Sequence, residues 1–177
     1  MILDLHSHSV KSDDGRAKVD NYCKWIRSRE IGIDGFVLTE HRQFDFWIGT
    51  WDVFNPDGRK VGTNRITLEL NGCALHESWQ SLSGPHRGHS YNIYDRTTDQ
   101  WHQTWVDNTG LLLQLDGGLA EGRMVLEGTT RGSDGGETVN RITWSRQEDG
   151  TVRQFWEVSD DGGDTWSVAF DGRYVKR

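Results

Sequence analysis

The chain has 177 residues, and its composition excludes several classes of protein. Lys and Arg number 20 against 27 for Asp and Glu, a net charge of −7, whereas a nucleic-acid-binding protein needs cations to neutralise phosphates. Two cysteines cannot form a disulfide framework, and no apolar run approaches the roughly 20 residues of a membrane helix. The first residues lack the basic and apolar regions of a signal peptide. We therefore expect a cytoplasmic protein with no membrane or nucleic-acid partner.

The N-terminal part of the chain predicts a β-α-β unit. An apolar strand, residues 2–5, runs into His6 and His8, and a stretch with apolar residues at helical spacing follows. Residues 33–39 then indicate a second buried strand, parallel to the first through the helical crossover. His41 follows that strand. Because ligands bind at the carboxyl ends of parallel strands, we expect these three histidines to converge on one edge.

The residue types at this edge suit a divalent metal ion. His6 and His8 are two apart on an extended segment, so both imidazoles can reach one ion. Asp13 or Asp14 can add an oxygen ligand, and Glu40 can act as a ligand or orient one. The pattern therefore predicts a metal site and no nucleotide cofactor.

These segments resemble the first two motifs of the PHP (polymerase and histidinol phosphatase) family. The matching stretches are 4–9 (DLHSHS), 12–13 (SD) and 34–41 (DGFVLTEH). The family's members are metal-dependent phosphoesterases built as distorted (β/α)7 barrels, commonly with up to three metal ions. The resemblance implies that Mn, Fe or Zn would be held by His6, His8, Asp13 and His41. It stops near residue 45, and the family's later ligand motifs, including its closing D-x-H, are missing. The alternative is therefore a set of inherited residues that no longer forms a full site.

Residues 46–177 predict a series of short strands. Turns with Gly, Asp or Asn separate most of them, and Asn71-Gly72 predicts a type I′ hairpin turn. About ten strands at this spacing indicate an antiparallel barrel or sandwich, and a closed barrel has no exposed edges. The predicted strands are 47–54, 64–70, 73–79, 89–94, 101–106, 111–115, 123–127, 139–145, 152–158 and 165–170.

The start of this region favours the barrel. Residues 46–51 (FWIGTW) resemble the G-x-W opening of calycins, the lipocalins, fatty-acid-binding proteins and their relatives. The resemblance implies that a cation on the last strand packs across the ring of Trp51, and Arg173 is placed to do so. Residues 45–172 are also similar to a family of uncharacterised bacterial calycin-like domains. The expected fold is mainly β, an antiparallel calycin-like β-barrel of about ten strands with an N-terminal β-α-β appendage.

Three further features have a structural and a functional interpretation. Residues 159–166 fit the Asp-box pattern S-x-D-x-G-x-T-W, whose repeated copies mark sialidase-type propellers. We interpret this single copy as a hairpin-stabilising turn, in which Asp161 accepts backbone N–H groups and Trp166 packs beneath. The eight tryptophans that follow Phe46 can line a ligand pocket or form core pairs. Four histidines are candidate ligands, but no second feature supports haem, and surface positions are expected. They are His76, His86, His89 and His102.

No Gly-, Pro- or Ser-rich linker separates the two parts, residues 1–45 and 46–177. We therefore infer a truncated PHP-like fragment fused to a complete calycin-like domain. The fusion arose either by recombination or by faulty assembly of the gene sequence. The function expected is binding of a small molecule in the barrel, beside a partial metal site. The alternative is a metal-dependent phosphoesterase that hydrolyses a phosphate ester, and a third hypothesis is a non-catalytic interaction module. The sequence does not specify the ligand, the oligomeric state or whether the barrel is hollow.

Overall fold

A computed structural model describes residues 3–7, 35–38 and 43–177 of the chain. The chain divides into two compact units, Met1–Asp45 and Phe46–Arg177. In the parts that the structure describes, no helix has the length and apolar character that crossing a membrane requires.

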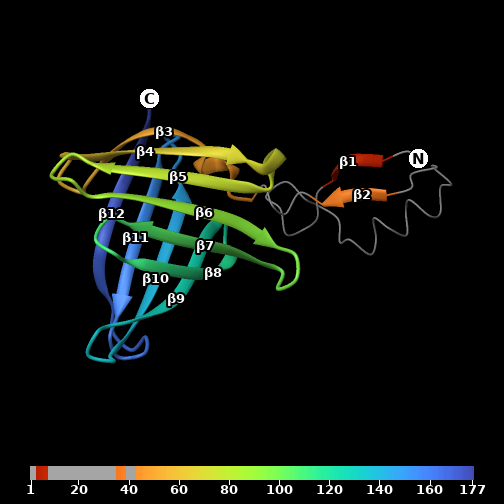
Figure 1. The fold of residues 1–177 in the computed structure, drawn as a ribbon. Coiled ribbons are helices and arrows are strands. Elements are labelled where there is room, and N and C mark those ends of the chain that lie inside the picture. The colour runs from red at the N-terminus through yellow and green to blue at the C-terminus, as the bar shows by residue number, and fades with distance from the viewer. Residues whose placement is uncertain (1–2, 8–34, 39–42) are drawn as a thin grey trace. The chain divides into compact units, whose positions relative to one another are not determined.

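Unit 1 contains two short strands, β1 (Leu3–Ser7) and β2 (Gly35–Leu38). They pair in parallel, with Asp4 opposite Phe36 (Figure 1). Both predicted strands and their parallel pairing are therefore confirmed. The predicted crossover helix lies outside the described residues.

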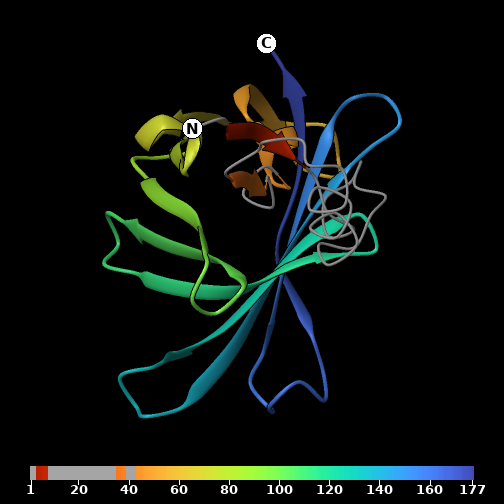
Figure 2. The same ribbon diagram turned by 90° about the vertical axis from the view of Figure 1, so that its right-hand side faces the viewer.

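Unit 2 is a closed antiparallel barrel of ten strands (Figures 1 and 2). Each strand pairs with the next one along the chain, and β12 pairs with β3 to complete the ring. All ten predicted strands are present, and the barrel, not the sandwich, is confirmed. The strands are β3 (Gly49–Phe54), β4 (Lys60–Glu69), β5 (Ala74–Ser81), β6 (Arg87–Asp95), β7 (Gln100–Asp107), β8 (Leu112–Ala120), β9 (Arg123–Arg131), β10 (Glu137–Arg146), β11 (Val152–Ser159) and β12 (Ser167–Lys176). Single 3-10 turns, η2 (Asp45–Trp47) and η3 (Leu70–Gly72), are the helical elements among the described residues.

Side-chain alternation determines which residues face the barrel interior. Along β6, Gly88, Ser90 and Asn92 are buried, while Tyr91 and Ile93 are exposed. Successive side chains of a strand point to opposite faces, so every second residue faces inward. Several of these inward residues are polar, and they therefore need hydrogen-bond partners inside the barrel.

The turn between β4 and β5 is wider than predicted. Glu69 lies opposite Ala74, so four residues connect the strands instead of two. Left-handed backbone begins at Leu70, with φ of 51°, and continues through Asn71, with φ of 57°. The hairpin is confirmed, but the type I′ turn at Asn71-Gly72 is wrong, because the left-handed run starts one residue earlier and forms η3.

Aromatic side chains fill one end of the barrel. Trp47, Trp51, Trp144 and Tyr174 are almost completely buried. The Trp47 ring lies 5.3 Å from that of Trp144, and the Trp51 ring lies 6.3 Å from that of Tyr174. The Trp51 indole donates to the Trp47 carbonyl oxygen at 2.9 Å. This end of the barrel is therefore a packed core.

The cation over the Trp51 ring is not the expected one. The ammonium of Lys176 lies 5.5 Å from the ring centroid of Trp51. Arg173 instead forms an ion pair with Asp149 at 2.7 Å. The register of β12 against β3 explains the correction, because Lys176 is opposite Trp51 and Arg173 is opposite Phe54.

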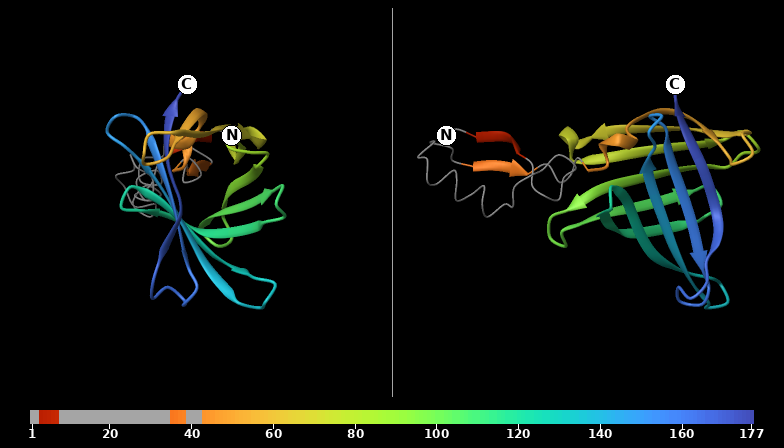
Figure 3. Two further views of the ribbon diagram at one scale, coloured as in Figure 1. Left: turned by 90° about the vertical axis from the view of Figure 1, so that its left-hand side faces the viewer. Right: turned by 180° about the vertical axis from the view of Figure 1, so that it is seen from behind.

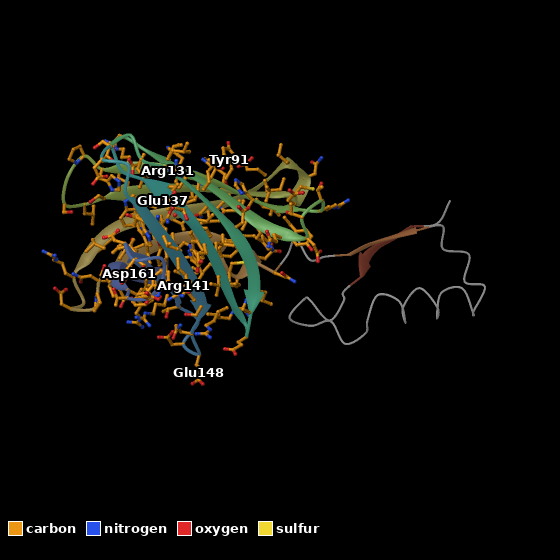
Figure 4. All side chains as sticks on the ribbon, turned by 90° about the horizontal axis from the view of Figure 1, so that it is seen from below. Tyr91, Arg131, Glu137, Arg141, Glu148 and Asp161 are labelled. Carbon is orange, nitrogen blue, oxygen red and sulfur yellow. The ribbon has the colours of Figure 1, made fainter. Side chains whose placement is uncertain are left out.

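The Asp-box segment forms the hairpin turn between β11 and β12, and this prediction is confirmed. Asp161 accepts the backbone N–H of Thr165 at 2.9 Å, and the Trp166 indole donates to the Gly163 carbonyl at 2.9 Å. The Arg141 guanidinium of β10 lies 3.7 Å from the centroid of the Trp166 ring; Figure 4 labels Arg141 and Asp161. This turn and the β9–β10 turn reach the same end of the barrel (Figure 3).

Candidate ligand-binding cavity

The other end of the barrel contains a cavity of about 260 Å³. Most of its wall is aromatic or aliphatic, and its polar groups come from five strands or adjoining loops. The apolar lining residues are Trp79, Trp105, Leu113, Ile142, Trp156, Ala169 and Phe170. The polar lining residues are Glu77, His86, Gln103, Gln154 and Tyr174.

Glycines on adjoining strands make room for two of the wall indoles. A Cβ at Gly62 of β4 would lie 2.2 Å from the Trp79 ring, and a Cβ at Gly88 of β6 would lie 2.1 Å from the Trp105 ring. Real Cβ atoms do not approach other atoms so closely. The absence of a side chain at these two glycines therefore lets the indoles lie close against the backbone of the barrel wall.

One side of the cavity is incompletely covered by strands. β12 pairs with β11 from Ser167 onward, but it pairs with β3 only from Arg173 to Lys176. Ala169 and Phe170 lie in the segment between, and Ala169 is exposed. This segment gives the cavity an opening to solvent.

A buried carboxyl group forms part of the polar floor of the cavity. Glu77 is only 3% exposed and accepts hydrogen bonds from Asn64 Nδ2 and Ser90 Oγ, each at 2.6 Å. Burial raises the pKa of Glu77 to about 7, although both hydrogen bonds act in the opposite direction. The carboxyl group is therefore poised to gain or lose a proton near neutral pH.

The hydrogen bonds of the floor extend from Asn64 of β4 to residues of β12 and β11. The Tyr174 hydroxyl donates to Gln154 Oε1 and accepts from Asn64 Nδ2, the latter at 3.3 Å. Burial, and secondarily the charge of Glu77, raises the pKa of Tyr174 well above its ordinary value, so this phenol stays neutral. Asn64 is 1% exposed, and its Oδ1 has no hydrogen-bond partner among the described residues. The Glu77 carboxyl group, held by Asn64 and Ser90, is therefore the acidic group that the floor presents to the cavity.

Asp107 fixes the rim of the cavity. Its side chain is 4% exposed and accepts hydrogen bonds from the Trp105 indole at 3.2 Å and, with the proton on Nε2, from His86 at 3.1 Å. Burial alone would raise the pKa of Asp107, but the hydrogen bonds from Thr109, His86 and Trp105 outweigh it and hold the pKa well below the usual range. The ionised carboxylate thus orients one wall indole and one rim imidazole.

Only one of the predicted metal ligands lies among the residues that the structure describes. His6 lies in β1, while His8, Asp13, Glu40 and His41 lie outside the described residues. Over residues 3–7, 35–38 and 43–177, no group of three or more His, Cys, Asp or Glu side chains could hold a metal ion.

The eight tryptophans of unit 2 have both of the roles that the sequence allowed, since some form the core and others line a pocket. Four are fully buried in the core, three line the cavity, and one belongs to the Asp-box turn. The core residues are Trp47, Trp51, Trp101 and Trp144, the cavity residues are Trp79, Trp105 and Trp156, and the turn residue is Trp166.

Three of the four candidate histidines lie on the outer face of the barrel, as expected. His76 and His89 contact each other through ring nitrogens 3.1 Å apart. His102 pairs with Asp116 at 2.7 Å. His86 is the exception, because it lines the cavity while 42% of its side chain remains exposed.

Glu77 is a site residue that the sequence patterns did not predict. A signal was present, because Leu75, Glu77 and Trp79 share one face of a predicted strand, and a carboxylate between two apolar residues on a core-facing stripe is unusual. The partners of Glu77 are Asn64 and Ser90, each 13 residues away on a neighbouring strand, so the register of two hairpins determines these contacts.

Fold and site together define a closed antiparallel β-barrel that is packed at one end and hollow at the other. No protein-family model matches the chain, and no curated protein matches it. The geometry of the cavity is therefore the basis for the function proposed below.

Proposed function

We propose that unit 2 is a calycin-like barrel that binds a small organic molecule in its cavity. The observation that carries this proposal is the combination of aromatic walls with a buried, hydrogen-bonded polar floor. Ligand sites are concave and mostly apolar, with a few polar groups that fix orientation, and the mouths of β-barrels are among their common locations.

The cavity volume limits the size of the enclosed part of the ligand. A cavity of roughly 150 Å³ can hold benzene, so about 260 Å³ corresponds to roughly ten non-hydrogen atoms. Trp79, Trp105, Trp156 and Phe170 are only half-buried, so a ligand that covers them removes apolar surface from water. Burial of apolar surface is worth roughly 25 cal/mol per Å² and supplies the affinity.

A neutral aromatic alcohol tests the proposal. One molecule of 2-phenylethanol should bind per barrel. Isothermal titration calorimetry should give a dissociation constant of about 10 μM to 1 mM. Trp156→Ala removes an aromatic wall and should weaken binding about tenfold or more. Tyr91→Ala is the matched control, because Tyr91 is exposed on the outer face. Absence of binding to the wild type, or equal weakening by both variants, contradicts the proposal.

For unit 1 we propose a divalent-metal site formed by His6, His8, Asp13 and His41. Support comes from the parallel pairing of β1 and β2, because parallel strands present their carboxyl ends at one edge. A metal held there would orient a phosphate ester and lower the pKa of a bound water, the chemistry of a phosphoesterase.

Metal content of the purified full chain, measured by mass spectrometry after dialysis, tests this second proposal. We expect near-stoichiometric Mn, Fe or Zn in the wild type and its loss in His6→Ala/His8→Ala. The control is His76→Ala/His89→Ala, which removes two histidines from the outer face of the barrel. Metal-free wild type, or equal loss in both double variants, overturns the metal site.

A further inference from the structure

The charge of the cavity is one-sided. None of its lining residues is Lys or Arg, and its titratable side chains are Glu77, His86 and Tyr174. Tyr174 stays neutral, so Glu77 is the group that brings a formal negative charge to the floor. Its two hydrogen-bond donors, Asn64 and Ser90, are uncharged.

We infer that the ligand is an organic cation, a protonated amine on a small aromatic or aliphatic body, whose ammonium group pairs with the Glu77 carboxylate while its body lies among the cavity indoles. The inference rests on the proposed function and adds the chemical class of the ligand.

The hydrogen-bonding capacity of the floor supports an ammonium group. An ionised carboxylate has about four acceptor positions, and Asn64 and Ser90 fill two of those on Glu77. The remaining acceptor positions of Glu77 can serve a ligand, because this residue lines the cavity. An ammonium group carries three donors and no acceptor, which complements this arrangement.

The aromatic walls favour the same ligand. Trp79, Trp105, Trp156 and Phe170 all line the cavity. The face of an aromatic ring, and of tryptophan above all, attracts a cation, and rings arranged as a cage recognise organic ammonium ions. These walls also bury the apolar body of the ligand.

An anionic ligand is disfavoured by the same features. A ligand carboxylate would lie beside Glu77, with no lysine or arginine among the lining residues to neutralise either charge. Buried charges are stable only when they are paired. The cavity should therefore discriminate by charge among molecules of equal size.

Three ligands of nearly equal size separate the alternatives: phenethylammonium, 2-phenylethanol and phenylacetate. Calorimetry on the full chain at pH 8 should show the ammonium binding about tenfold or more tightly than the alcohol, and the carboxylate most weakly. In Glu77→Gln, the ratio of ammonium affinity to alcohol affinity should fall about tenfold or more, so that the preference for the ammonium disappears. Both affinities are measured on the same variant, so the ratio, and not either affinity alone, reports the role of the carboxylate.

The outcomes distinguish the inference from the function on which it rests. If the alcohol binds and the ammonium binds no more tightly, the inference is overturned and the proposed function stands. Binding of none of the three overturns the proposed function itself. A preference for the ammonium that survives in Glu77→Gln also overturns the inference, because the carboxylate would not be its cause.

A second measurement needs no variant of Glu77. Because the folded-state pKa of Glu77 is about 7, ammonium binding at pH 6.5 should release part of a proton from the carboxyl group. Calorimetry in buffers of different ionisation enthalpy measures this release, and His86→Gln should retain it. Zero release by the wild type, or its loss in His86→Gln, contradicts pairing of the ligand with Glu77.

Discussion

Glu77→Gln is expected to stabilise the barrel above pH 7 and to remove one component of its pH dependence. Burial raises the pKa of the Glu77 carboxyl from 4.5 to about 7 in the folded state. Between these values the folded chain binds more protons than the unfolded chain, so its stability falls as the pH rises. The full loss, complete above pH 7, corresponds to about 3 kcal/mol. Glutamine does not titrate and avoids this loss.

Guanidinium unfolding of wild type and variant from pH 5 to pH 8 measures the difference. The two free energies of unfolding should be similar near pH 5, and the variant should be the more stable by up to about 3 kcal/mol at pH 8. Glu127→Gln is the control, because it removes an exposed carboxylate and should change stability by less than about 0.5 kcal/mol. If the free energies of unfolding of wild type and Glu77→Gln changed in parallel with pH, the raised pKa of Glu77 would be contradicted.

A buried carboxyl group that destabilises the barrel at neutral pH calls for a functional reason. Stability is commonly traded for activity at binding sites, where charged or polar groups are retained despite their cost. A cationic ligand would pair with Glu77 and offset that cost, which links the stability prediction to the inferred ligand class.

Gly88→Ala is expected to destabilise the barrel by about 1–3 kcal/mol and to weaken ligand binding. The added Cβ would lie 2.1 Å from the Trp105 ring, so the indole must move away from the barrel wall. The φ angle of Gly88 is not positive, so the cost arises from the indole and not from the backbone. Gly118→Ala is the matched control, because Gly118 lies in a strand and a Cβ added there would have no atom within 4 Å.

A double-mutant cycle with Trp105→Ala tests the cause of this effect. If the indole is responsible, Gly88→Ala should cost much less in the Trp105→Ala background, with a coupling energy of about 1 kcal/mol or more. Urea unfolding at pH 6 provides the four free energies. An equal cost of Gly88→Ala in both backgrounds would show that the backbone, and not Trp105, determines it.

Much of the barrel could be predicted from the sequence because its determinants are local. Strict alternation from Ile66 to Leu70 and the recurrent Gly, Asp and Asn turns define strands that pair with their chain neighbours. The tryptophans of unit 2 show what side-chain alternation cannot predict. Alternation indicates that Trp101 and Trp105 of β7 both face inward, but not that Trp101 lies in the packed core and Trp105 in the cavity wall. Position along the barrel axis depends on the stagger of all the strands.

Register is the other determinant that the sequence did not reveal. Lys176, not Arg173, lies over Trp51 because of the pairing between the last strand and the first strand of the barrel. The pairing of β11 with β12 contains a register shift after Trp156, which no turn residue signals. The polar floor depends on the same long-range pairing, because Asn64, which donates to Glu77 of the adjacent strand, also donates to Tyr174 of the last strand.

A crystal structure of the full chain grown with 4-bromophenethylamine would show directly whether the cavity holds an organic cation against Glu77. We predict an anomalous bromine peak inside the cavity among Trp79, Trp105 and Trp156. We also predict the amine nitrogen at about 2.7–2.9 Å from a carboxylate oxygen of Glu77. An empty cavity with bromine peaks only on the outer surface of the barrel would contradict the inferred ligand class.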